Sequence, residues 1–142
     1  MILIGIIVSY EDIKNREISN KVIILGAITG VIIGIIDKNF IKAFIGSIIM
    51  AAPIFLLAWM YTLVRDRQGI GGGDIKVALV YGMFLKSSIL IFSAYFITFI
   101  TAGIMLLIKK LVNIKGGKWR EIPLIPFMSI GTIVVYIIQS II

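Results

Sequence analysis

Two aspartates, Asp12 and Asp74, are the residues of this chain whose surroundings most clearly suggest chemistry. Asp12 follows the apolar stretch MILIGIIVSY, and Asp74 follows three glycines and lies just before the apolar stretch VALVYGMFL. Two carboxylates brought together cannot both ionise cheaply, so such a pair shares one proton. One aspartate can then act as a base on water while the other acts as an acid on a carbonyl, which is the chemistry of peptide hydrolysis.

Each aspartate also has a plain structural interpretation. Asp74 could cap the start of a helix, with the glycines as an ordinary loop. Asp12 could pair with Lys14 or Arg16 at a membrane surface. Neither interpretation explains why both carboxylates would lie at one depth and on one side. Glu11 competes less well than its neighbour, because it points about 100° away from it around a helix.

The composition indicates a membrane protein. Of the 142 residues, 60% are hydrophobic and only 15% are charged, which is more apolar surface than a small soluble domain can bury. The chain has no cysteine and no histidine, which excludes disulfides, thiolate metal sites and histidine-based catalysis. We therefore expect no cofactor and no metal. The net charge of +7 fits basic cytoplasmic loops better than nucleic-acid binding.

Uncharged runs predict the membrane segments, at residues 1–10, 22–36, 43–64, 77–85, 87–108 and 122–142. A membrane helix needs roughly 20 residues, and the first and fourth runs are too short to cross alone. The first helix must therefore continue through Asp12 towards Arg16, and the fourth must begin at or before Asp74. The same arithmetic places both aspartates at one edge of the membrane.

Basic residues predict the orientation of these segments. Eleven of the 14 fall on one side and three on the other, if alternate connections lie on opposite sides. The larger set belongs in the cytoplasm. We therefore predict an all-α, polytopic membrane protein with about six transmembrane helices, both termini outside, and a single membrane-embedded domain over residues 1–142. The site would lie at the cytoplasmic side of the cell (inner) membrane.

Three motifs, in order along the chain, resemble those of the type IV prepilin peptidases. DIKNREISN at 12–20 resembles their Asp…Arg-x-Ile-Pro-Asn loop, GGGD at 71–74 fits their Gly-x-Gly-Asp signature, and EIPLIPFMSIG at 121–131 resembles their late Ile-Pro-x-x-Pro-Phe…Gly segment. The resemblance implies an intramembrane aspartyl protease that removes the short basic leader of prepilins or pseudopilins, after a glycine and before the apolar pilin helix.

The resemblance also implies roles for individual residues. Asp12 and Asp74 would be catalytic, and the supporting or substrate-binding residues would be Gly71, Gly73, Arg16, Asn20, Pro123 and Pro126. Gly71 and Gly73 are expected to leave room for the substrate backbone or to adopt positive φ. Ser19 stands where the family usually has proline, so the loop is expected to be less rigid.

The expected partners are the pilin-type substrate, the lipid bilayer and the pilus or secretion assembly machinery. The chain starts directly at the first protease helix without a cysteine-bearing segment, so we expect the compact form, without pilin methylation. The basic loops would contact either anionic lipid or the assembly machinery. The alternative function is a small cation- or proton-coupled transporter that uses the same two aspartates as a relay.

Overall fold

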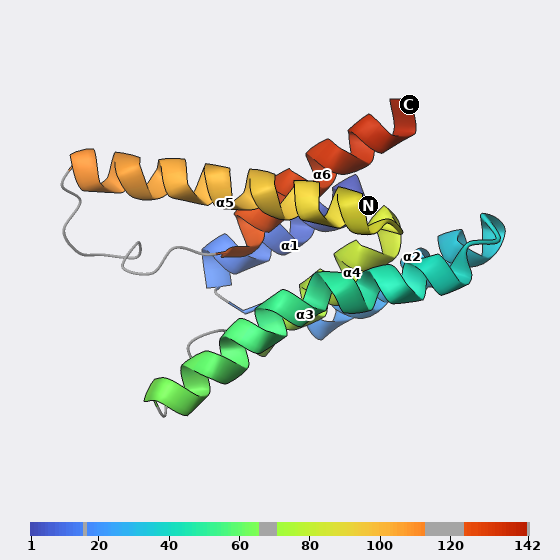
Figure 1. Cartoon of the computed structure of the whole chain (residues 1–142), viewed down its shortest axis with the longest axis horizontal. Coiled ribbons are helices and arrows are strands. Elements are labelled where there is room, and N and C mark those ends of the chain that lie inside the picture. The colour runs from blue at the N-terminus through green and yellow to red at the C-terminus, as the bar shows by residue number, and fades with distance from the viewer. Residues whose placement is uncertain (16, 66–70, 113–123, 142) are drawn as a thin grey trace.

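The computed structural model describes residues 1–15, 17–65, 71–112 and 124–141. These residues form six helices and, within the described ranges, no strand. The helices are α1 (Ile2–Asn15), α2 (Asn20–Ile36), α3 (Phe40–Arg65), α4 (Gly72–Leu85), α5 (Ser88–Leu111) and α6 (Leu124–Ile141). The all-α prediction is confirmed for this part of the chain. Figure 1 shows the C-terminal ends of α3 and α5 on one side of the molecule and both chain termini towards the other.

Within the described part of the chain, three helices are long and apolar enough to cross a membrane: α3 over Phe40–Leu63, α5 and α6. Helix α2 is apolar but shorter, at 17 residues. Helices α1 and α4 have 14 residues each, or about 21 Å of helix. The two predictions made from segment length are confirmed, because α1 continues through Asp12 to Asn15 and α4 begins at Gly72, before Asp74.

Helix α4 lies at the centre of the bundle (Figure 1). Seven of its 14 residues are buried, against three of 17 in α2. It packs most extensively against α3, and also contacts α2, α5 and α6. Large apolar side chains elsewhere face outwards, as expected for helices in lipid, for example Leu3, Ile41 and Phe92.

Glycines allow the closest helix crossing. A Cβ atom added at Gly82 of α4 would lie 2.2 Å from the backbone oxygen of Gly46 of α3, and one added at Gly46 would lie 2.5 Å from the oxygen of Gly82. The two backbones therefore touch, which is the packing that small residues provide between membrane helices. This crossing fixes α4 against α3.

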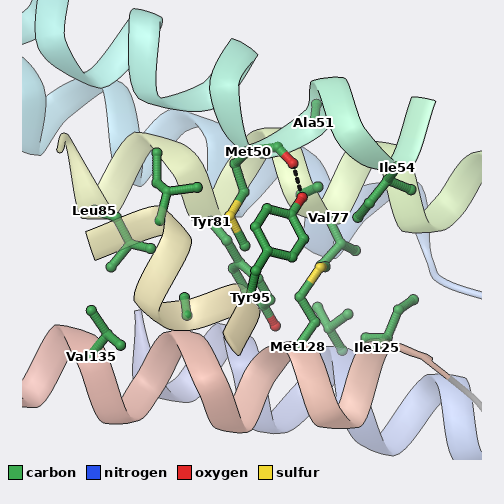
Figure 2. Close-up of a cluster of buried hydrophobic side chains, with 14 residues drawn as sticks. Met50, Ala51, Ile54, Val77, Tyr81, Leu85, Tyr95, Ile125, Met128 and Val135 are labelled. Carbon is green, nitrogen blue, oxygen red and sulfur yellow. Dashed lines mark hydrogen bonds between the residues drawn. The ribbon is translucent and has the colours of Figure 1, made fainter. Parts of the chain in front are cut away.

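Side chains from α3, α4, α5 and α6 fill the core beside this crossing (Figure 2). Tyr81 of α4 and Ser129 of α6 share a buried hydrogen bond of 2.5 Å between their hydroxyl oxygens. The Tyr95 hydroxyl of α5 donates to the backbone oxygen of Met50 of α3, drawn as the dashed line in Figure 2. Both hydroxyls are thus satisfied inside an apolar interior, where an unpaired one would be costly.

Candidate active site

Asp12 lies in the last turn of α1 and Asp74 in the first turn of α4. Asp12 is buried, with 9% of its surface exposed, and Asp74 is half-buried. The charge of Asp12 acts on Asp74, so the two carboxylates lie close enough to interact. The structure therefore brings together the pair that the sequence indicated.

The backbones of the two helices that carry the pair stay apart, although their side chains share the core, where Val8 of α1 belongs to the same buried cluster as Val77 and Tyr81 of α4. Every Cα atom of α1 lies more than 8 Å from every Cα atom of α4 within the described residues. The backbones of the two helices pack mainly on different neighbours, α1 on α6 and α2, and α4 on α3 and α2. Parts of the chain that contact both helices therefore help to set the separation of the two carboxylates.

Asp74 is held by the start of α4. Gly71 is the N-cap residue, with φ −67° and ψ 141°, and its carbonyl accepts the Asp74 N–H at 3.1 Å. Asp74 is therefore a first-turn residue, and the interpretation of Asp74 itself as the cap is wrong. The free N–H groups at a helix start favour a negative charge in this position.

The three glycines differ in what surrounds them. A Cβ added at Gly73 would lie 3.1 Å from Cδ1 of Ile18, whereas one added at Gly72 would meet nothing within 4 Å and one at Gly71 only the Gly73 nitrogen, at 3.9 Å. Gly71 has negative φ and the other two lie in the helix, so the expectation of positive φ is wrong. The close approach at Gly73 is made by the chain's own α1–α2 loop.

That loop also contacts both helices through polar groups. The Ser19 N–H donates to Oε2 of Glu11 at 2.9 Å, and Nζ of Lys76 donates to Oδ1 of Asn20 at 3.1 Å. Asn20, a predicted supporting residue, is thus joined to α4 two residues beyond Asp74. Sequence reasoning set Glu11 aside and counted Lys76 only as a charge. No spacing rule links Glu11 to a residue eight positions later, so only the folded loop identifies it.

The remaining predicted residues are less well placed. Arg16 and Pro123 lie outside the described residues. Pro126 is the third residue of α6, a position where proline is tolerated because its missing N–H would have no helical partner. Lys14, proposed as an ion-pair partner of Asp12, extends over the ring of Tyr10, with its Nζ 5.5 Å from the ring centre.

The comparisons with known proteins agree with the motifs. No curated protein and no solved structure matches the chain. The family model of the type IV leader peptidase family matches residues 1–108, about three quarters of the chain, a range that contains both aspartates and the three glycines. It ends before the 121–131 segment, so that third likeness rests on the sequence motif alone. A match of this extent, together with the helical membrane architecture, shows that the chain belongs to the type IV leader peptidase family.

Proposed function

We propose that this membrane peptidase is of the aspartic type and that Asp12 and Asp74 are its catalytic residues. The observation that carries the proposal is that two carboxylates, from helices far apart in the sequence, lie close enough to interact at one site. Family membership supports a protease and gives no support to the transporter alternative. Arg16, Asn20, Pro123 and Pro126 keep the supporting roles predicted for them, and Gly71 and Gly73 are proposed to leave room beside Asp74 without positive φ.

The chemistry follows from one proton shared by two carboxylates. The ionised aspartate takes a proton from water, and the water oxygen attacks the scissile carbonyl carbon. The protonated aspartate gives its proton to the carbonyl oxygen, which forms a neutral tetrahedral intermediate. When the C–N bond breaks, the first aspartate returns its proton to the leaving nitrogen and the second regains one from the collapsing diol.

The proposed substrate is the junction between a short basic leader and the apolar helix of a prepilin or pseudopilin, cut after glycine. We place this site at the cytoplasmic edge of the cell (inner) membrane, in a single domain of residues 1–142 with six spans and both termini outside. The biased distribution of basic residues supports this orientation. Pilus or secretion assembly machinery would be the partner that receives the processed pilin.

The test is to replace each carboxylate by the amide of the same shape. Asp12→Asn and Asp74→Asn should each abolish leader cleavage, by at least about 1000-fold, because an amide cannot serve as base or share the proton. Cleavage of a co-expressed prepilin is followed by gel shift, normalised to the amount of membrane protein. Glu17→Gln is the matched control, since Glu17 is an exposed acid beside the same site. Substantial cleavage by either aspartate variant would refute the assignment.

A further inference from the structure

The separation of the two aspartates is not set by contact between the backbones of their helices. Residues 18–20, which we call the bridging loop, precede and begin α2, and they touch both α1 and α4. The bridging loop is therefore a direct link between the last turn of α1 and the first turn of α4. The residues that the bridging loop contacts are Glu11, which precedes Asp12, and Gly73 and Lys76, which lie within two residues of Asp74.

Glu11 makes the contact on the α1 side. Its Oε2 accepts the backbone N–H of Ser19 at 2.9 Å, in a partly buried position. A bond to a charged acceptor is roughly twice as strong as one between neutral groups. Ser19 is the N-cap of α2 in extended conformation, with φ −62° and ψ 123°, and its carbonyl accepts the N–H groups of Val22 and Ile23 at 3.1 and 3.4 Å. Glu11 thus binds the residue from which α2 begins.

Ile18 and Asn20 make the contacts on the α4 side. Ile18 packs on Gly73 so closely that no Cβ fits there without a shift, and Asn20 accepts a hydrogen bond from Lys76. These two residues stand on either side of Ser19. A displacement of Ser19 would therefore move both contacts that flank Asp74.

We propose that Glu11 is a positioning residue, which holds the bridging loop through the Ser19 N–H and so fixes the distance between Asp12 and Asp74. The inference deepens the proposed function and depends on it for its catalytic consequence. Glu11 does not touch the reacting atoms in this account. The backbone N–H of Ser19 is the essential donor, whereas its hydroxyl has no part in the link.

The first test compares variants at Glu11. Glu11→Ala removes the acceptor and should lower the single-turnover cleavage rate roughly 10- to 100-fold, because small misplacements of catalytic groups are costly. Glu11→Gln keeps an acceptor oxygen of the same reach and should restore the rate to within about threefold of the parent. Glu17→Ala removes an exposed acid that precedes the bridging loop and should leave the rate unchanged. Equal loss in Glu11→Ala and Glu11→Gln, or no loss in either, would overturn the proposal.

Ser19→Pro removes the donor with little disturbance of the backbone. Proline holds φ near −65°, which Ser19 already adopts, but has no N–H to give. In the Ser19→Pro background Glu11→Ala should therefore change the rate by less than about twofold, because the bond is already absent. If Glu11→Ala lowers the cleavage rate by the same factor in the parent and in the Ser19→Pro variant, Glu11 acts by another route and the proposal fails.

A spectroscopic test does not depend on activity. The chain has no cysteine, so Asn15→Cys at the end of α1 and Gly72→Cys at the start of α4 can carry spin labels, both at exposed positions. The distance distribution between the labels should broaden or shift in Glu11→Ala and stay as in the parent in Glu11→Gln. An unchanged distribution in Glu11→Ala would overturn the positioning role even if cleavage fell. If the distribution broadens in Glu11→Ala but the parent protein itself cleaves no prepilin, the link through Glu11 is retained and the proposed function is rejected instead.

Discussion

At the residue scale, the crowding at Gly73 gives the sharpest steric prediction. Gly73→Ala places its methyl group against Cδ1 of Ile18 and should slow cleavage about tenfold, whereas Gly72→Ala meets nothing and should be tolerated. Ile18→Val deletes Cδ1 itself, so Gly73→Ala combined with Ile18→Val should recover most of the lost rate. Single-turnover rates normalised to protein level decide the matter. Failure of the double variant to recover would mean that substrate, and not Ile18, needs the space beside Gly73.

The carboxylate pair also predicts a pH dependence at this scale. When both aspartates are protonated no base remains, and when both are ionised no acid remains, so the cleavage rate should fall at both low and high pH. The two limbs belong to the pair, since the charge of Asp12 acts on Asp74. The profile is measured in detergent over the range where the protein stays folded. A flat profile would contradict the shared proton.

Sequence reasoning found the pair but missed the link between its helices. Asp12 and Asp74 can be found from the sequence because the uncharged runs 1–10 and 77–85 are too short to cross a membrane unless their helices extend through these residues. Glu11 was dismissed because its direction on α1 differs from that of Asp12. The direction of a side chain on one helix does not reveal its partner beyond that helix, and the partner of Glu11 is a backbone N–H in the following loop. Tertiary packing decides which loop atom forms a hydrogen bond with a helix residue.

At the element scale, the position of Asp74 depends on the crossing of α3 and α4, because Asp74 lies in the first turn of α4. The all-α class and both short helices follow from apolar segment length. Nothing in the sequence indicates that Gly46 and Gly82 face each other, because each glycine seen alone fits any membrane helix. Their contact depends on how α3 and α4 are aligned along each other, and the sequence of neither helix alone specifies that alignment.

Gly82→Ala should therefore be strongly destabilising. The added methyl would lie 2.2 Å from the Gly46 oxygen and 2.6 Å from Cα of Ser47, both backbone atoms that cannot swing aside. We expect a loss of about 2–3 kcal/mol or more in unfolding free energy. Gly103→Ala in α5 is the matched control, because nothing lies within 4 Å of that site. Unfolding in mixed detergent micelles compares the two, and equal stability would show that the helices separate at little cost.

At the scale of the whole molecule, the two ends of the bundle differ in chemistry. Asp12, Asp74 and the bridging loop occupy one end. An ion pair between Asp37, just after α2, and Lys86, just after α4, joins the connections that follow these two helices. Since α4 starts at the aspartate end, its other end carries this pair. Three of the helices among the described residues have the length to span the membrane, so the crossing of α1, α2 and α4 is the part of the topology to test.

Cysteine accessibility provides that test, because the chain has no cysteine of its own. With the aspartate end in the cytoplasm, Gly72→Cys should react with a membrane-impermeant maleimide only after the cells are opened, and Asn39→Cys, in the α2–α3 connection, should react in intact cells. Gly72 is exposed and Asn39 is half-buried in the bundle, so the access of the reagent to them depends on the membrane rather than on burial within the protein. The reverse pattern would place the catalytic pair outside and contradict the positive-inside argument. Reaction of both in intact cells would mean that α3, the helix between them with the length to span the membrane, does not separate them.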